Sequence, residues 1–349
     1  MLTADAKLPY VPMSAAQGVE LADEATLTIA WPAGEPPLVS VVCVTYNHEA
    51  FIKTALRGFL VQATEFPFEV LVHDDASSDR TPEIIRDYAS RYPRIVKPIC
   101  QQENQYSKGR KIIPPLLAMA LGKYVALCDG DDLWVDARKL ARQVAILEAN
   151  QGLDLCWHDC RVLDCRTGRV SPRRAAHTPV GHVPVSEVIA NDGGFVPTPS
   201  LLMRRSAIED MPEWFLRYAP ISDYFYQIYA ARRGGGYYLE DPMAVYRSNH
   251  AGSWTSHNWH DTNRRLRFEQ AFHKCVELAE KDFAGLSSSF SSLIFQHFTR
   301  LGLFALRHRS REIFDFAQAT VAARAGDFRH VEAAIASIVF LRLWRAFLR

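Results

Sequence analysis

The sequence predicts an α/β protein with a Rossmann-like, mostly parallel sheet flanked by helices, followed by a C-terminal helical region. The first observation is a series of short apolar runs between residues 38 and 158, which are typical of strands buried on both faces. The second is that segments with apolar residues at helical spacing separate the early runs. Strands and helices that alternate in this way favour right-handed crossovers and a doubly wound sheet.

The expected elements follow one another closely as far as residue 158. Strands are expected at 38–44, 69–73, 95–99, 123–128 and 153–158. Helices are expected at 49–63 and 136–150, and two more are expected between them, one that begins at residue 82 and one that ends at residue 121. Beyond Thr167 prolines interrupt the pattern, until a helix is expected at 221–231 and an edge strand at Tyr237–Leu239. From about Asp261 to Arg349 the chain is expected to be helical, with a break at Gly326-Asp327.

The composition is that of an ordinary globular protein: 349 residues, of which 48% are hydrophobic and 23% charged. The formal net charge of +1 gives no overall attraction to nucleic acid or to an anionic membrane, so no nucleic-acid partner is expected. The first residues lack a secretion signal, and no window reaches the roughly 18 apolar residues of a membrane span. The seven cysteines lack paired spacing and are expected to be reduced thiols. Together these features predict a cytoplasmic protein.

Three polar clusters follow expected strands, at Thr45–Asn47, Asp74-Asp75 and Asp129–Asp132. In an open parallel sheet, ligands bind in the crevice at the carboxyl ends of the strands. We therefore expect these clusters to meet in space, although about 85 residues separate the first from the last.

The cluster Asp129-Gly130-Asp131-Asp132 carries three carboxylates in four residues. Like charges at such spacing resist ionisation unless a cation or strong donors neutralise them. Mg²⁺ and Mn²⁺ prefer carboxylate and phosphate oxygens, so the cluster predicts a site for a metal-bound diphosphate. The alternative is a polar turn in which Asp132 only caps the next helix.

The other two clusters are suited to a nucleotide. Asp74 and Asp75 could accept hydrogen bonds from a base or a ribose, whereas Ser77, Ser78 and Asp79 are expected to cap the following helix. Thr45-Tyr46-Asn47 offers a hydroxyl, an aromatic face and an amide, although such triplets are also common in turns. The absence of Gly-x-Gly-x-x-Gly and of a P-loop motif argues against a dinucleotide dehydrogenase and a P-loop nucleotidase.

Three segments in this order resemble the signatures of family 2 glycosyltransferases, which have the GT-A fold: Leu38–Asn47 (LVSVVCVTYN), Glu69–Thr81 (EVLVHDDASSDRT) and Lys123–Trp134 (KYVALCDGDDLW). The similarity extends from Val39 to about Trp254, and the first motif, commonly Pro-x-Tyr-Asn, appears here as Val44-Thr45-Tyr46-Asn47. Tyr246–Trp254 resembles the segment that often closes these domains, with His250 one residue later and one glycine fewer.

The resemblance implies roles on the donor side of the site. Thr45, Tyr46 and Asp75 would surround the base, Asp129 would lie near the ribose, and Asp131 would be the principal metal ligand. We place Asn47, Asp74 and Asp132 in the same nucleotide-sugar site. Arg247 could pair with diphosphate oxygens, and His250 could complete the metal shell.

The resemblance also implies a general base on a helix beside the donor, and Asp223 in Ile221–Phe225 (ISDYF) is the best match. The segment lacks the Glu-Asp pair often seen there, and the alternative is a helix-start carboxylate with Ser222 as the cap. Asp223 would deprotonate the acceptor hydroxyl while Mn²⁺ or Mg²⁺ neutralises the leaving diphosphate, which implies inversion.

The sequence therefore predicts an N-terminal extension at 1–37, a GT-A catalytic domain at 38–256 and a helical region at 257–349. The expected partners are a nucleotide diphosphate-sugar donor and a glycan or lipid-linked glycan acceptor of cell-surface biosynthesis. Two other functions remain open: a nucleotidyltransferase, which would need a lysine- and glycine-rich loop after the first strand, and a non-catalytic nucleotide-sugar-binding module.

Two further segments invite weaker hypotheses. Cys156, His158, Cys160 and Cys165 suggest zinc, although their spacing matches no standard finger. The run Ile338–Arg349 (IVFLRLWRAFLR) mixes arginines with aromatic residues and could dock on the inner face of a membrane, or else pack as a terminal helix.

Overall fold

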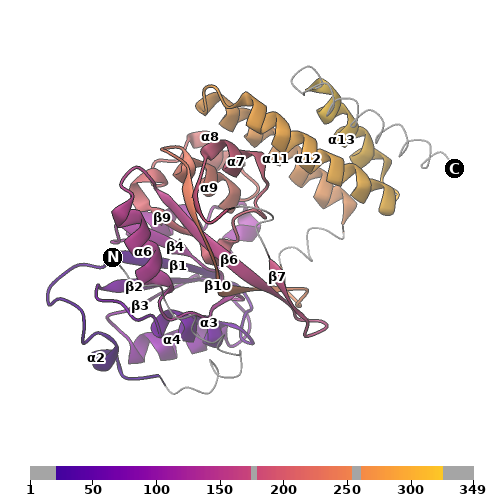
Figure 1. Ribbon diagram of the computed structural model, residues 1–349. Coiled ribbons are helices and arrows are strands. Elements are labelled where there is room, and N and C mark those ends of the chain that lie inside the picture. The colour runs from indigo at the N-terminus through magenta and orange to yellow at the C-terminus, as the bar shows by residue number, and fades with distance from the viewer. Residues whose placement is uncertain (1–20, 174–178, 254–260, 325–349) are drawn as a thin grey trace.

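The computed structural model describes residues 21–173, 179–253 and 261–324. Their strands form one sheet in the order β3-β2-β1-β4-β9-β6-β10-β5, with β7 paired to β6 and β8 to β10. Helices cover both faces: α3 and α4 lie on one side, and α7, α8 and α9 on the other (Figure 1). The predicted α/β class with a C-terminal helical region is confirmed.

The first half of the sheet is parallel and has the order β3-β2-β1-β4. Its elements alternate along the chain as the apolar periodicity predicts: β1 (Val39–Thr45), α3 (Ile52–Leu60), β2 (Phe68–Asp74), α4 (Thr81–Arg91), β3 (Val96–Cys100), α5 (Ile113–Met119) and β4 (Tyr124–Leu127). β1 and β2 are buried along almost their whole length, which explains their near-continuous apolar sequences.

The second half of the sheet is mixed. β9 is antiparallel to both β4 and β6, whereas β10 is parallel to β6 and antiparallel to β5 and β8. The strands of this half are β5 (Leu133–Trp134), β6 (Leu155–Asp164), β7 (Val170–Arg173), β8 (Gly181–Val183), β9 (Leu202–Arg204) and β10 (Gly236–Ser248). The accompanying helices are α6 (Lys139–Ala149), α7 (Val185–Ala190), α8 (Glu213–Tyr218) and α9 (Asp223–Ala231). Short helical segments add α2 (Glu24–Leu27), η1 (Tyr106–Lys108), η2 (Thr198–Ser200) and η3 (Arg205–Ala207).

The expectation of an edge strand at Tyr237–Leu239 is wrong. These residues begin the 13-residue strand β10, which has β6 on one side and β8 and β5 on the other. Pro242 lies where the β6–β10 register shifts between Leu239 and Ala244. This irregularity takes the proline out of the hydrogen-bonded ladder, so an interior strand can contain it.

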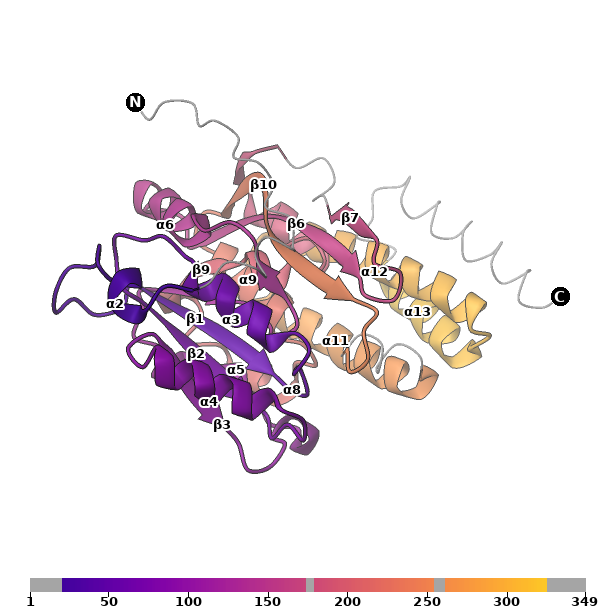
Figure 2. The same cartoon turned by 90° about the horizontal axis from the view of Figure 1, so that it is seen from below.

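The sheet separates two hydrophobic clusters. Successive residues of β1 point to opposite faces, so Val41 belongs to the cluster with α3 and α4 and Val42 to the other. Figure 2 shows α3 and α4 in front of the sheet, with α11, α12 and α13 away from that face. The cluster around Val42 continues through Tyr224 of α9 into Phe272 and Phe290, so the helical region shares a core with the sheet.

The helical region consists of α11 (Thr262–Asp282), α12 (Ser287–Arg307) and α13 (Arg311–Ala323). The chain turns between them at 283–286, where Gly285 has φ +79°, and at 308–310, where the Ser310 side chain caps α13. The predicted break at Gly326-Asp327 and the run Ile338–Arg349 lie outside the described residues. Among the helices that are described, none is both long and apolar enough to cross a membrane.

A buried polar node fixes the entry to β4. Ser40 Oγ donates to Glu69 Oε1 at 2.6 Å and accepts from the Gly122 amide at 2.9 Å. A Cβ at Gly122 would lie 2.5 Å from Ser40 N and 2.7 Å from Tyr124 O. Because these are backbone atoms, only glycine lets the chain approach β1 so closely.

We therefore expect Gly122→Ala to lower the free energy of unfolding by about 1–3 kcal/mol, because the ladder of β4 must shift to admit the methyl group. Urea denaturation of the purified protein measures this change. The matched control is Gly152→Ala, since nothing lies within 4 Å of a Cβ at Gly152. Equal stabilities of the two variants would contradict the close-packing argument.

Candidate functional site

The three polar clusters that follow β1, β2 and β4 lie at the same edge of the sheet. The strands are parallel and in register, with Thr45 opposite Asp74. Backbone hydrogen bonds continue past the strand ends: Asp75 N donates to Thr45 O at 3.0 Å, and Gly130 N to Val44 O at 2.8 Å. Residues separated by about 85 positions in the sequence are thus neighbours in space.

Gly130 lets the acidic turn Asp129–Asp132 lie directly against the end of β1. A Cβ at this position would meet the Thr45 side chain at 2.7 Å. The Thr45 hydroxyl is itself buried and has no hydrogen-bond partner. An unpartnered buried hydroxyl at the edge of an open site is available to a ligand.

The surroundings of Asp129 and Asp132 disfavour the ionised form of both carboxyl groups. Burial first, and the neighbouring Asp131 and Asp223 second, raise the pKa of Asp129 to about 8. Burial and the charges of Asp131 and Asp129 likewise raise the pKa of Asp132 well above its usual value. Asp132 Oδ1 accepts from Arg247 N at 2.8 Å, but its Oδ2 is buried without a partner. The turn therefore holds more negative charge than the protein itself neutralises.

Asp131 differs from its two neighbours because imidazoles face it. Burial would raise its pKa, but the hydrogen bond from His250 and the charges of His48 and His250 outweigh burial and lower it. His250 Nε2 lies 2.9 Å from Asp131 Oδ2, and His48 Nε2 lies 3.7 Å from the same oxygen. The same hydrogen bond raises the pKa of His250, whereas burial lowers that of His48.

The Asp131–His250 pair offers one carboxylate oxygen and one imidazole nitrogen, atom types that can ligate a divalent cation such as Mn²⁺. His250 Nδ1 is 3.0 Å from Ala251 O, the second hydrogen bond that typically orients a metal-ligating imidazole. The separation of 2.9 Å matches two adjacent ligands at about 2.1 Å from an octahedral ion. Within the described residues no group of three or more His, Cys, Asp or Glu side chains forms a ready metal site. Water and diphosphate oxygens usually complete such shells.

Arg247 is fixed across the acidic turn by contacts in three directions. Its Nη1 donates to Asp131 O at 2.7 Å and its Nη2 to Thr54 Oγ1 at 2.9 Å. The guanidinium also lies 5.2 Å from the centre of the Phe51 ring. Burial lowers its pKa despite the nearby carboxylates, but an arginine stays charged. Arg247 thus supplies a buried positive charge beside Asp131 and Asp132.

Of the other residues predicted on the donor side, most are engaged by the protein. Asp74 accepts from the Ser77 amide and hydroxyl, and Asn47 Oδ1 accepts from Ser78 N at 2.9 Å. Asn47 has φ +54°, a conformation that asparagine tolerates better than most residues. Asp75 accepts from the amides of Gln105 and Tyr106 at 2.7 and 3.0 Å. The Tyr46 ring, in contrast, is 45% exposed.

Asp223 is the first residue of α9 and lies close to the acidic turn. Its charge contributes to the raised pKa of Asp129, so the two carboxylates are near enough to interact electrostatically. Asp223 Oδ1 accepts from Tyr224 N at 2.8 Å, and Oδ2 lies 3.4 Å from Thr198 Oγ1. Ser222, the cap in the alternative interpretation, makes no capping hydrogen bond through its side chain.

Sequence reasoning missed His48, which lies 3.7 Å from Asp131. Its position directly after Thr45-Tyr46-Asn47, in the turn already assigned to the site, could have drawn attention to it. The zinc hypothesis gains no geometric support: Cys156, His158 and Cys160 are buried within β6, and all seven cysteines are free thiols.

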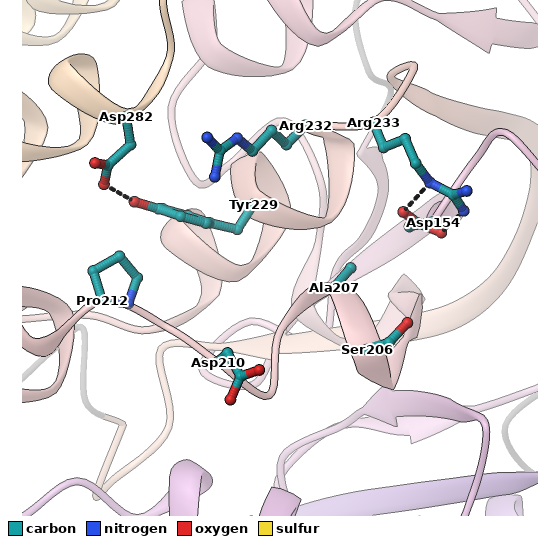
Figure 3. Close-up of a pocket in the computed structure, with 9 residues that line it drawn as sticks. All are labelled: Asp154, Ser206, Ala207, Asp210, Pro212, Tyr229, Arg232, Arg233 and Asp282. Carbon is teal, nitrogen blue, oxygen red and sulfur yellow. Dashed lines mark hydrogen bonds and ion pairs between the residues drawn. The ribbon is translucent and has the colours of Figure 1, made fainter.

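A separate cavity of about 560 Å³ lies at the opposite end of α9, near the end of α11 (Figure 3). Two of its acidic groups already have partners, since Asp154 pairs with Arg233 and Asp282 accepts from the Tyr229 hydroxyl. Tyr229, the residue of α9 that lines this cavity, is six residues after Asp223, or about 9 Å along the helix. The cavity is therefore distinct from the acidic turn.

Comparison with known proteins places the chain among glycosyltransferases. A model of the family described as "Glycosyl transferase family 2" matches residues 40–211. Rv1520 of Mycobacterium tuberculosis is 36% identical over 242 residues, which are 67% of this chain and 65% of that protein. The match thus spans slightly less than two thirds of this relative. A shorter match, 32% identical over 114 residues, covers 32% of this chain and 42% of WfgD of Escherichia coli, a UDP-Glc:alpha-D-GlcNAc-diphosphoundecaprenol beta-1,3-glucosyltransferase.

Two solved structures share the fold at low sequence identity. S. aureus TarS in complex with UDP is 17% identical with a TM-score of 0.54, covering 88% of this chain and 89% of that one. Mannosyltransferase PcManGT from Pyrobaculum calidifontis, in complex with GDP-Man and Mn²⁺, is 20% identical with a TM-score of 0.51, covering 96% and 87%. These two likenesses show that the fold is GT-A-like, and the family match identifies the chain as a member of glycosyl transferase family 2.

Proposed function

We propose that this protein transfers a sugar from a nucleotide diphosphate-sugar to an acceptor hydroxyl, with inversion at the anomeric carbon. The observation that carries this proposal is the under-neutralised turn Asp129–Asp132 beside Asp223. A turn with excess negative charge is suited to a cation and a diphosphate, and a second carboxylate nearby is suited to deprotonate a hydroxyl. Family membership supports the same reaction class.

The donor would lie along the ends of β1, β2 and β4. Tyr46, with its exposed ring, and Thr45, with its unpartnered hydroxyl, are the residues we assign to the base. Asn47, Asp74 and Asp75 shape the turns around it and retain free lone pairs on oxygens that already accept one bond. Asp129 and Asp132 would face the ribose and the diphosphate. The complexes of TarS with UDP and of PcManGT with GDP-Man support a nucleotide-linked donor.

Asp131 and His250 would hold Mn²⁺ or Mg²⁺ against the diphosphate, with Arg247 beside them. The ion, when bound, supplies Lewis-acid neutralisation of the charge that develops on the leaving diphosphate. His250 would then be a neutral ligand through Nε2, its Nδ1–H remaining on Ala251 O. Arg247 contributes a fixed positive charge that needs no reorganisation during the reaction.

Asp223 would accept the proton of the acceptor hydroxyl as its oxygen attacks the anomeric carbon. The bond from this carbon to the diphosphate oxygen breaks on the opposite face, and the nucleoside diphosphate leaves with the electron pair. One displacement of this kind inverts the anomeric configuration. The Asp223 carboxylate therefore needs to be ionised and aimed at the acceptor before the donor reacts.

The acceptor we favour is a glycan or a lipid-linked glycan of cell-surface biosynthesis. The name of WfgD, whose acceptor is a diphosphoundecaprenol-linked sugar, supports this class. We assign the catalytic domain to 38–256, after an extension at 1–37 and before a helical region at 257–349. A cytoplasmic location, with the helical region at the inner face of the membrane, is consistent with such an acceptor.

The first test measures nucleotide released from a panel of UDP-, GDP- and dTDP-sugars with Mn²⁺, Mg²⁺ or EDTA. We expect metal-dependent release from one donor and a loss of at least about a hundredfold in Asp131→Ala and Asp223→Asn, because each removes a group needed in the transition state. Asp210→Asn, an exposed carboxylate at the separate cavity, is the control and should retain full activity. Unaltered release from Asp223→Asn would refute its role as base.

The raised pKa of Asp129 predicts how metal binding depends on pH. Its folded-state pKa, about 8, exceeds the ordinary value of 3.8, so folding favours the protonated form. The stability it contributes is complete below pH 3.8 and is lost as the pH rises through 8. A divalent cation relieves the charge that then develops.

We therefore expect Mn²⁺ to raise the Tm more at pH 9 than at pH 6, and to raise it little in Asp131→Asn at either pH. Thermal unfolding with Mn²⁺ or EDTA measures these shifts. A Tm increase of the same size at both pH values would show that Asp129 does not sense the cation.

A further inference from the structure

The loop between β3 and α5 connects the donor side of the site, at Asp75, to the end of α8, at Ala219. Its first half is bound to Asp75, which accepts from the amides of Gln105 and Tyr106. Asn104 Nδ2 also donates to Asp75 O at 3.0 Å, and Arg110 N closes the turn on Gln105 O at 3.1 Å. This end of the loop is thus anchored at the end of β2.

The second half of the loop ends at Lys111, which makes contacts far away in the sequence. Its ammonium donates to the carbonyl oxygen of Ala219 and lies 5.5 Å from the centre of the Phe215 ring. Both partners are buried, and burial lowers the pKa of Lys111. A lysine that gives up hydration in this way is held in one position by its partners.

The Ala219 carbonyl ends α8, where helix carbonyls lack an amide donor from their own helix. Ala219 is buried, so its carbonyl needs a hydrogen-bond donor from the protein. Lys111 supplies this donor, and its charge also complements the negative end of the helix. Only Pro220, Ile221 and Ser222 separate Ala219 from Asp223.

We propose that Lys111 is a positioning residue: by holding the Ala219 carbonyl it fixes the turn 220–222 and aims the Asp223 carboxylate at the acidic turn. This inference rests on the proposed role of Asp223 as the general base. The loop 104–111 then ties the donor side, through Asp75, to the base, through Lys111. Lys111 itself touches neither substrate nor metal in this arrangement.

The deciding experiment is a double-mutant cycle on nucleotide release with Lys111→Met, Asp223→Asn and the double variant. We expect Lys111→Met alone to lower kcat about ten- to a hundredfold, as a small displacement of a catalytic group does. In the Asp223→Asn background the same change should lower kcat less than twofold, because a residue that acts through Asp223 has nothing left to position. Donor affinity, measured by calorimetric titration, should stay within twofold.

Two controls separate positioning from general damage. Lys108→Met, in the same loop but paired only with exposed Glu103, should leave kcat and hydrogen exchange unchanged. Lys111→Met should speed amide exchange in peptides that cover 219–226, and Lys111→Arg, which keeps a charged donor, should restore part of kcat.

The outcomes distinguish this inference from the function on which it rests. The positioning role would be overturned if the loss of kcat in the double variant equalled the product of the two single losses, or if amide hydrogen exchange at 219–226 were unchanged in Lys111→Met. Either result would leave the proposed function intact. Full activity of Asp223→Asn would overturn the proposed function, and the inference with it.

Discussion

The packing of three carboxylates into one turn, with Asp132 buried and Asp129 and Asp131 half-buried, is the constraint on which the rest of this site depends. Asp129, Asp131 and Asp132 lie against β1 because Gly130 has no side chain to keep the turn away. Their environments then separate them: the pKa of Asp129 and Asp132 rises, while imidazoles lower that of Asp131. Such a turn stores repulsion that a bound cation would relieve, so cation binding and electrostatic relief would be one event.

The protein compensates only part of this repulsion, and it does so with residues from the far end of the sheet. Arg247 and His250 come from β10 and the turn after it, more than 110 residues beyond the carboxylates they contact. Their arrival depends on β10 being an interior strand beside β6, with β5 on its other side. Had β10 been an edge strand, as its sequence predicted for Tyr237–Leu239, the positive charges would not be enclosed.

Sequence reasoning was most successful where the physical signal is local. The runs that became β1, β2 and β4 are apolar because both faces are covered, and parallel strands necessarily bring their carboxyl ends to one edge. The order of strands beyond β4 could not be predicted in this way, because β9 has only three residues and its two antiparallel partners are distant in sequence. His48 was missed for a related reason: its burial depends on Phe51 and His250, which only the folded chain brings to it.

The acceptor side of the site depends on the helical region more than its position in the sequence suggests. Asp223 begins α9, whose Tyr224 packs against Phe272 of α11 with ring centres 5.7 Å apart. Arg300 of α12 pairs with Asp192 at 3.0 Å, and Asp192 is adjacent to Gly193, which faces the Asp223 carboxylate. Two elements of the helical region therefore hold both flanks of the helix start that carries the proposed base.

If the reaction proceeds as proposed, this arrangement separates its donor half from its acceptor half. The donor half is built from the ends of parallel strands, which are held by ladders of backbone hydrogen bonds and leave little freedom. The acceptor half is built from side-chain contacts between α9 and helices that follow the sheet in sequence, and side-chain contacts are easier to alter without unfolding the sheet. Variation in acceptor specificity is therefore expected to arise in α7, α9 and the helical region, while the donor site is constrained by the backbone that forms it.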